Sequence, residues 1–295
     1  MRQSYGERGK TMKKWLHASF VILVLGVFLF SSVRLLAYFT RYRLSGNARE
    51  EAVTEFTRKS SVAMRTGEAD SPVAQAGQRG NTDAPDGGAD NNADGRPVYA
   101  PIEVDFTRLR QVSADAVGWI YCEGTVINYP VVYGRDNEYY LERDYRGSYD
   151  PNGAIFTDMR NEKGFTDHNV ILYGHHMQDG SMFASLKNWF TPSYYEAHPV
   201  MWLLTPEQDY RVEIFAAYPT TAGSDTYSVF QEPGQQLENY LNWVMKWTVI
   251  QPEVETGPDG HYIVLSTCAY SWEDARTVLH GKLIPVDSAG GIPLR

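Results

Sequence analysis

Eight short apolar segments follow one another between Gly118 and Val286, and this series is the strongest constraint on the fold. Each has the length of a strand, and each is bounded by Gly, Pro, Asp or Asn, which are typical of turns. A run of short strands predicts a barrel or a sandwich, and so a mainly β domain. The segments are GWIYCEG, TVINYPVVYG, GAIFTD, NVILYG, PVMWLLT, YRVEIFAAY, HYIVLSTC and RTVLHGKLIPV.

Three further segments have helical spacing. DFTRLRQV precedes the first strand and places Phe106, Leu109 and Val112 at helical intervals. Two later segments gather apolar side chains on one side, which predicts helices that cover the sheet. They are SMFASLKNWF, with Met182, Phe183, Leu186, Trp189 and Phe190, and QQLENYLNWVMKW, with Leu237, Tyr240, Leu241, Val244 and Trp247.

The N-terminal region contains a candidate membrane span. Residues 15–33 read WLHASFVILVLGVFLFSSV, close to the roughly 20 apolar residues that cross a bilayer. Five basic side chains and one acid precede this run, so we expect residues 1–14 to be a cytoplasmic tail and the rest of the chain to be extracellular. A cleaved signal peptide is the alternative, but the run is long for one and no small-x-small cleavage site follows it. The sequence therefore favours a single-pass anchor in the cell membrane.

A linker is expected between this anchor and the folded domain. The segment 65–97 is rich in Gly, Asp, Asn, Ala and Pro, and Val73 is its only large aliphatic residue. Burial cannot offset the entropy of ordering such a segment. We therefore expect 34–98 to form a juxtamembrane segment and a flexible tether, 99–286 the folded domain, and 287–295 a C-terminal tail.

The charge of the chain is unevenly distributed. Residues 1–43 hold eight of the 27 basic side chains and one of the 36 acidic ones. The remaining 19 basic and 35 acidic side chains give the rest of the chain a net charge of −16. An anionic exterior domain argues against nucleic-acid binding.

The strand HYIVLSTC ends on a cysteine. Alternation places Ser266 and Cys268 on one face of this strand and Thr267 on the other. The next strand begins at Arg276, and if the two strands pair as a hairpin, Cys268 and Arg276 lie near its open end and can share a pocket. A thiol is a nucleophile only as the thiolate, which needs a neighbouring cation or base. Arg276 offers a permanent charge and a donor fork for an oxyanion.

A histidine is the missing partner of this cysteine. The segment NVILYGHHM contains two histidines immediately after a strand, and Gly174 allows tight backbone geometry at the strand end. Cysteine, histidine and arginine together can catalyse acyl transfer. The residues alone do not choose between His175 and His176.

These residues resemble the sortases, membrane-anchored cysteine transpeptidases of Gram-positive bacteria. The signature of that family is T-L-x-T-C followed by an arginine, with G-H upstream, and this chain has VLSTC at 264–268, Arg276, and Gly174 before His175. Val264 replaces the leading threonine. The resemblance runs from about Phe106 to Val286 and is most like class B, because it includes VGWI, INYPVV, YYL, GAIF, YGHHM, GSMF and the helical insert at 235–247.

The resemblance implies an eight-stranded sortase-type β-barrel, with an N-terminal helix and a helix inserted before the cysteine strand. It implies that His175, Cys268 and Arg276 are catalytic, without a metal or organic cofactor. Ser266, on the strand face of Cys268, and Thr267, within the motif, are expected to bind substrate. The implied partners are surface proteins with an LPxTG-like or NPQTN-like sorting signal, and an amine of a peptidoglycan precursor or of a pilin lysine.

Other interpretations of the same residues stay open. Cys268 could form a disulfide with Cys122, which otherwise is a small buried hydrophobe. His175 and His176 could bind a metal with His168, although no motif spacing supports zinc. Arg276 could form a surface ion pair with Glu273 or Asp274. The rival functions are an exported cysteine protease that only hydrolyses and a tethered adhesion or scaffold domain with an inert thiol.

Overall fold

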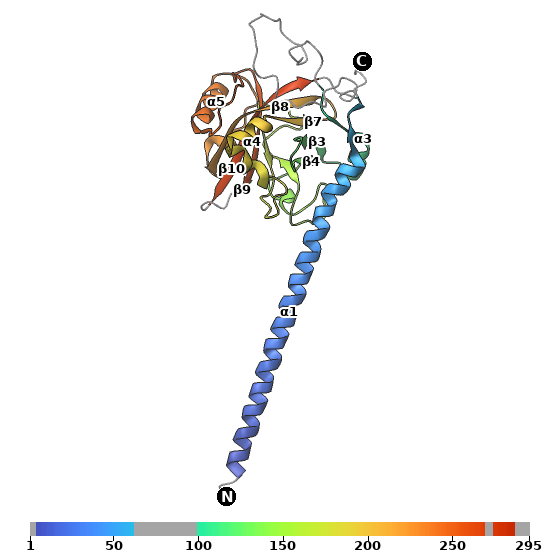
Figure 1. Cartoon of the computed structure of the whole chain (residues 1–295), viewed down its shortest axis with the longest axis vertical. Coiled ribbons are helices and arrows are strands. Elements are labelled where there is room, and N and C mark those ends of the chain that lie inside the picture. The colour runs from blue at the N-terminus through green and yellow to red at the C-terminus, as the bar shows by residue number, and fades with distance from the viewer. Residues whose placement is uncertain (1–3, 62–98, 269–273, 287–295) are drawn as a thin grey trace, which may run out of the picture. The chain divides into compact units, whose positions relative to one another are not determined.

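The structure is a computed structural model of the whole chain (Figure 1). It describes residues 4–61, 99–268 and 274–286. The chain divides into two compact units, Met1–Asn47 and Ala48–Arg295. The expected C-terminal tail, 287–295, lies outside the described residues.

The long helix α1 (Ser4–Phe56) contains the candidate membrane span. Its 19-residue stretch Ser19–Ala37 has a mean hydropathy of 2.4, and none of it is buried in the structure. By length and composition, this stretch is sufficient to cross a bilayer. It begins and ends four residues later than the expected span, 15–33, because His17 lowers the hydropathy at the start and two leucines extend the run at the end.

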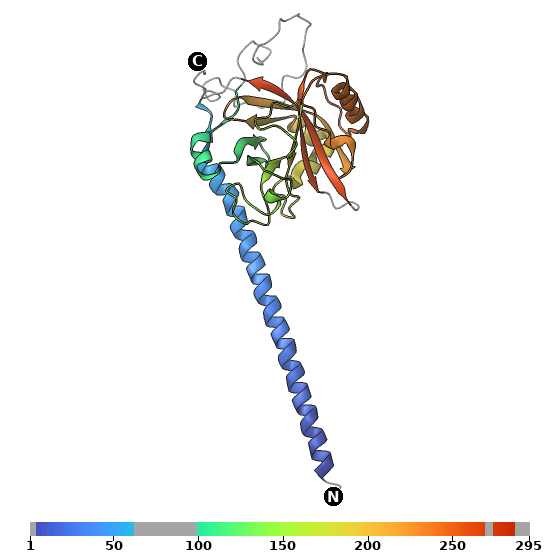
Figure 2. The ribbon, with the colours of Figure 1, turned by 180° about the vertical axis from the view of Figure 1, so that it is seen from behind.

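The unit Ala48–Arg295 is built on a β-barrel, which Figure 2 shows from behind. The barrel is closed and has eight strands, in the order β10-β8-β7-β3-β4-β5-β6-β9. Each of the eight segments predicted from the sequence forms one of these strands, so the expected fold class is confirmed. The pairs β4 with β5 and β6 with β9 are parallel, and the other pairs are antiparallel. The strands are β3 (Ala116–Tyr121), β4 (Asn128–Tyr133), β5 (Ile155–Thr157), β6 (Asn169–Tyr173), β7 (Val200–Leu204), β8 (Asp209–Thr221), β9 (His261–Cys268) and β10 (Ala275–Val286).

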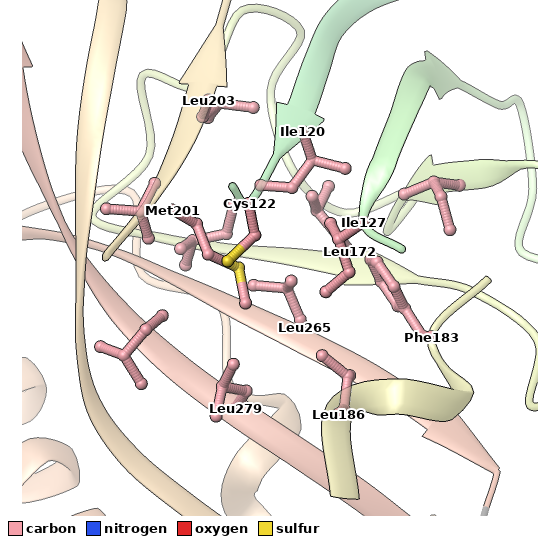
Figure 3. Packing of buried hydrophobic residues seen from close by; sticks show 14 of the residues in the cluster. Ile120, Cys122, Ile127, Leu172, Phe183, Leu186, Met201, Leu203, Leu265 and Leu279 are labelled. Atoms are coloured by element: carbon pink, nitrogen blue, oxygen red, sulfur yellow. The ribbon is translucent and has the colours of Figure 1, made fainter. Parts of the chain in front are cut away.

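Alternation along the strands separates two apolar faces. On β9, Leu265 joins the cluster inside the barrel, where Figure 3 shows it near Cys122 and Met201. Val264 belongs instead to the outer cluster that the helices cover. Burying an aliphatic side chain contributes roughly 1.5–3 kcal/mol. The two faces fix the register, because a slip of one residue would exchange them.

The two predicted helical segments differ in type. QQLENYLNWVMKW forms α5 (Gln235–Trp247), which packs Leu237, Leu241 and Val244 on the outer face of the barrel. Trp247 was expected on the same side but is 57% exposed, because it ends the helix and stacks its ring only on the edge of Trp243. The segment around Leu186 forms the 3₁₀-helix η3 (Ala184–Phe190) instead of an α-helix, and the remaining helices are also short. They are η2 (Tyr139–Leu141), α4 (Pro192–Ala197) and η4 (Asp225–Tyr227).

The chain packs on the barrel well before Tyr99, where we expected the folded domain to begin. Ala52 and Phe56, at the end of α1, are 0% and 2% exposed. They join a buried cluster with Leu109 of α3 (Phe106–Val112). The segment AREEAVTEF is charged overall, and its apolar contacts are few: the buried Ala52 and Phe56 and the partly buried Val53. Composition therefore did not reveal it.

A two-stranded ribbon follows this contact. β1 (Thr57–Lys59) pairs antiparallel with β2 (Ile102–Val104), and the Ser60 N–H donates to the Pro101 carbonyl at 2.9 Å. Residues 62–98, the main part of the expected tether, lie outside the described residues, but the ribbon holds their two ends together. This segment therefore adds nothing to the stretch of chain that links the candidate span to the folded unit. That stretch consists of residues 38–47, because the span ends at Ala37 and the unit begins at Ala48.

Deletion of 62–98 tests this closure. We expect a link of about six Gly and Ser residues in its place to raise the free energy of unfolding of the full-length protein by about 1–2 kcal/mol, because a shorter loop costs less entropy to close. Thermal unfolding in detergent measures the change. A proline at Glu103, which removes the N–H that this register directs at Arg58 of β1, serves as the destabilising control. A lower unfolding temperature for the deletion alone would show that the ribbon does not hold the two ends.

A buried histidine lies beneath α5. His280 of β10 is 0% exposed, and the Tyr240 hydroxyl lies 3.0 Å from its Nε2. Because that hydroxyl donates its hydrogen to the Thr226 carbonyl at 2.9 Å, Nε2 carries the proton and donates to the Tyr240 oxygen. Burial lowers the pKa of His280 to about 3.

This pKa predicts an acid-sensitive fold. Between the ordinary pKa of 6.5 and about 3, the unfolded chain binds a proton at His280 that the folded chain does not. Stability should therefore fall as the pH falls through this window, by up to about 1.4 kcal/mol per pH unit. Urea unfolding at several pH values measures this dependence. The free energy of unfolding should change less steeply with pH for His280→Gln than for the wild type. Equal slopes for the two proteins would contradict the assignment.

Candidate active site

Three neighbouring strands meet where the candidate residues lie, because β9 lies between β6 and β10. On one side, β9 and β10 are antiparallel, and Cys268 pairs with Arg276. The pair flanks the loop that connects the strands, so it lies at the closed end of the hairpin and not at the expected open end. The side chain of Cys268 and the loop residues 269–273 lie outside the described part of the chain.

On the other side, β6 runs parallel to β9. Tyr173 pairs with Ser266, and the next N–H, that of Gly174, donates to the Ser266 carbonyl at 3.1 Å. Continued for two residues, this register sets His175 beside Cys268. The backbone thus brings the positions of His175, Cys268 and Arg276 to three adjacent strand ends.

Gly174 is required by packing and not by a special backbone conformation. Its φ is not among the positive values of the described glycines, unlike the tight geometry that we expected. A Cβ at this position would clash with the Ile155 side chain and lie 2.8 Å from Cδ2 of Phe183. The missing side chain lets the end of β6 lie close against the barrel core.

The ring of His175 is fixed by one hydrogen bond. Its Nε2 lies 2.7 Å from the carbonyl oxygen of Leu141, at the end of η2. A carbonyl can only accept, so Nε2 carries a proton, and Nδ1 is left to exchange protons with a reacting group. The neighbouring His176 instead forms a β-bridge with Met182 across the following turn.

A metal site that combines these histidines with His168 does not fit the geometry. His168 precedes β6, at the opposite end of the strand from His175, and its ring stacks on His261 at 4.2 Å. Its Nδ1 is bonded to the Gly260 carbonyl at 2.8 Å. Within the described ranges, no three His, Cys, Asp or Glu side chains are placed to hold a metal ion.

Arg276 is partly exposed at the start of β10. Its Nη1 donates to the Ala275 carbonyl at 2.9 Å. Of the carboxylates that the structure describes, including the exposed Asp274, none forms an ion pair with Arg276. Glu273, the other ion-pair candidate, lies outside the described residues. The guanidinium thus has further N–H groups for a substrate oxygen.

Ser266 and Thr267 differ in their surroundings. The Ser266 hydroxyl lies 2.9 Å from the hydroxyl of Tyr227, on the face of β9 that the alternation predicts for Cys268. Thr267 is 3% exposed, on the face shared with Leu265, and its hydroxyl has no hydrogen-bond partner among the residues that the structure describes. Ser266 is equally buried, at 2% exposed, but its hydroxyl is bonded to the half-buried Tyr227 on the outer face of the barrel.

A hydrogen-bonded group beside these residues was missed in the sequence. The carboxylate of Asp158 accepts two bonds of 2.8 Å from Arg160 and one of 2.7 Å from the Tyr173 hydroxyl. The Tyr173 ring stacks on Tyr227 with centroids 6.1 Å apart. The only available signal was that Tyr173 directly precedes Gly174 and His175, because Asp158 and Arg160 follow a different strand, β5, and Tyr227 lies in η4.

The charge of this group is well defined. Burial alone would raise the pKa of the Asp158 carboxyl, but hydrogen bonds from Arg160 and Tyr173 outweigh burial and lower it. Burial and the bond to Asp158 raise the pKa of Tyr173. Asp158 therefore stays ionised and Tyr173 stays a neutral donor, which fixes the tyrosine ring next to the candidate site.

Cys122, the other cysteine, is free and buried. Its thiol lies 3.5 Å from the Val200 carbonyl, and burial raises its pKa to about 12. A free Cys122 rules out the disulfide with Cys268. Such a thiol is inert, so a thiolate at this site has to come from Cys268.

Substitution of Asp158 tests the group. Asp158→Asn should lower the free energy of unfolding by about 2 kcal/mol, because an amide cannot accept both bonds from Arg160. Asp259→Asn, at an exposed position, should change it by less than about 0.5 kcal/mol. Chemical denaturation compares the two, and equal effects would mean that the buried carboxylate is not stabilising.

Comparisons with known proteins agree with this arrangement, although no protein-family model matches the chain. Sortase B of Listeria monocytogenes is 36% identical over 191 residues, which cover 63% of this chain and 77% of that protein. A Staphylococcus aureus sortase B–substrate complex is 35% identical with a TM-score of 0.59, covering 62% of this chain and 85% of that one. A sortase B complexed with triglycine is 35% identical with a TM-score of 0.58, covering 62% and 86%. The barrel, the site sequence and these relatives together show that the chain belongs to the sortase family, as a class B sortase.

Proposed function

We propose that this sortase is anchored in the cell membrane by α1, cleaves the sorting signal of surface proteins through Cys268, and transfers the acyl group to an amine. The strand order carries the proposal. β9 lies between β6 and β10, so the positions of His175 and Arg276 flank Cys268 on both sides. This supports a site in which imidazole, thiolate and guanidinium act on one carbonyl group.

The first half of the reaction forms a thioester. The Cys268 thiolate attacks the carbonyl carbon of the signal threonine, and the guanidinium of Arg276 stabilises the oxyanion. As the C–N bond breaks, protonated His175 gives its proton to the leaving nitrogen. Because Nε2 is bonded to Leu141, we assign this transfer to Nδ1.

The second half releases the enzyme. Nδ1 of neutral His175 accepts a proton from the incoming amine as the amine attacks the thioester, and the Cys268 thiolate leaves. Water in place of the amine would give hydrolysis. Ser266 is proposed to line the substrate site through its bond to the half-buried Tyr227, whereas Thr267 is assigned to packing because it shares the face of Leu265, inside the barrel.

The substrates and the location follow from the relatives and from α1. Sortase B structures with a substrate and with triglycine support a sorting-signal peptide as acyl donor, LPxTG-like or NPQTN-like, and an amine of peptidoglycan or of a pilin as acceptor. The stretch Ser19–Ala37 supports a single-pass anchor. The basic residues before it support a cytoplasmic N-terminus and an extracellular barrel.

A transpeptidation assay tests the proposal. Full-length protein in detergent is given fluorogenic peptides with LPxTG or NPQTN and triglycine as acceptor, and mass spectrometry identifies the products. We expect a ligated peptide from the wild type and none from Cys268→Ala. His175→Ala should lose about 10²–10⁴-fold in kcat, and Arg276→Lys about 10²-fold, because an ammonium does not reproduce the guanidinium fork.

Cys122→Ala is the matched control and should keep the wild-type kcat, because this thiol is buried and inert. Cleavage without ligation at saturating triglycine would favour the purely hydrolytic protease. No cleavage of either peptide, together with an unreactive Cys268, would favour the scaffold. Full activity of Arg276→Lys would remove the oxyanion role from Arg276.

A further inference from the structure

A glycine lies against the carbonyl group that fixes His175. Gly153 has a φ of +63° and ends the loop before β5. A Cβ at this position would lie 2.5 Å from the Tyr140 oxygen, 2.7 Å from the Leu141 oxygen and 3.1 Å from Cδ2 of His175. Distances below 3.0 Å essentially never occur for a real Cβ, so a side chain would push η2, the His175 ring or both away.

The surrounding backbone leaves little freedom to absorb such a push. The Gly153 N–H donates to the Asp150 carbonyl and the Ala154 N–H to the Tyr140 carbonyl, both at 3.0 Å. Phe156, two residues after Ala154, pairs with Tyr173 of β6. The loop, η2 and the end of β6 are therefore tied together around Gly153.

We propose that Gly153 is a positioning residue for the reaction: the absence of a side chain lets the Leu141 carbonyl reach Nε2 of His175. This inference rests on the proposed catalytic role of His175. The carbonyl holds the ring at one angle and keeps the proton of the neutral ring on Nε2. Nδ1 is thereby kept available for the leaving nitrogen and for the incoming amine.

The alternative explanation of this glycine is its backbone conformation alone. Any residue with a Cβ is strained at a φ of +63°, but asparagine tolerates this region far better than alanine. Gly153→Asn therefore relieves most of the backbone strain and still introduces the Cβ. The two substitutions separate strain from displacement of the Leu141 carbonyl.

The test compares three variants of the full-length protein in the triglycine assay. Gly153→Ala and Gly153→Asn should both lose about 10–100-fold in kcat, as expected for a small displacement of a catalytic group, with little change in KM. Gly153→Asn should recover much of the thermal stability that Gly153→Ala loses. Gly164→Ala is the strain control, because Gly164 has a φ of +110° and a Cβ there meets nothing within 4 Å. It should lose stability but keep the wild-type kcat.

Nitrogen-15 spectra of selectively labelled histidines give a second readout, which does not depend on catalytic turnover. In the wild type, neutral His175 should carry its proton on Nε2, and both Gly153 variants should show a mixture of the two tautomers. A wild-type proton on Nδ1, or a wild-type kcat for Gly153→Asn, would overturn the inference. A different result would contradict the proposed function itself: full activity of His175→Ala would show that His175 is not catalytic.

Discussion

The site depends on the two hydrogen-bond ladders of β9. One ladder is antiparallel to β10 and pairs Cys268 with Arg276. The other is parallel to β6 and pairs Ser266 with Tyr173, just before His175. Because β9 is apolar on both faces, its register relative to both neighbours is fixed by the core. Three residues that are as much as 101 positions apart (175 to 276) thus reach one end of the barrel without a dedicated loop to gather them.

The parts of the site differ in what holds them. The backbone of Arg276 is held by its strand. In the described structure, its side chain donates a hydrogen bond only to the carbonyl of the preceding residue, Ala275. His175 lies two residues beyond the end of β6, so its ring angle is set by contacts outside the barrel, with the Leu141 carbonyl as the bonded partner. Asp158 and Tyr173 stabilise the adjoining surface through a buried, charge-assisted bond. A rigid barrel therefore supplies the positions, and short loops supply the orientation.

Much of the fold follows from local patterns. Apolar segments bounded by turn residues predicted all eight barrel strands, and helical spacing predicted α3 and α5. The packing of Ala52 and Phe56 was not predicted, because a few apolar positions in a charged segment are also common on exposed helices. The β1–β2 ribbon was missed because three-residue strands carry too little pattern. The exposure of Trp247 depends on where α5 ends relative to the sheet. The spacing of apolar residues along the sequence carries no information on that position.

The candidate site was predictable in identity but not in detail. The motif around Cys268, with Arg276 and His175, identified the family, and the register brings their backbones together. The Leu141 carbonyl and Gly153 were missed because a backbone oxygen and an absent side chain leave no chemical signature in a sequence. Tyr227 was missed because its partner Ser266 is 39 residues away, and Asp158 because its bond to Tyr173 joins two separate segments.

A crystal structure of the protein that resolves the side chain of Cys268 tests the central claim most directly. The account predicts that Sγ of Cys268 lies on the same side of the sheet as the His175 ring and the Arg276 guanidinium, near enough for both to reach one carbonyl group bound at the sulfur, within about 3–5 Å. A Cys268 side chain turned into the barrel, away from both groups, would contradict it.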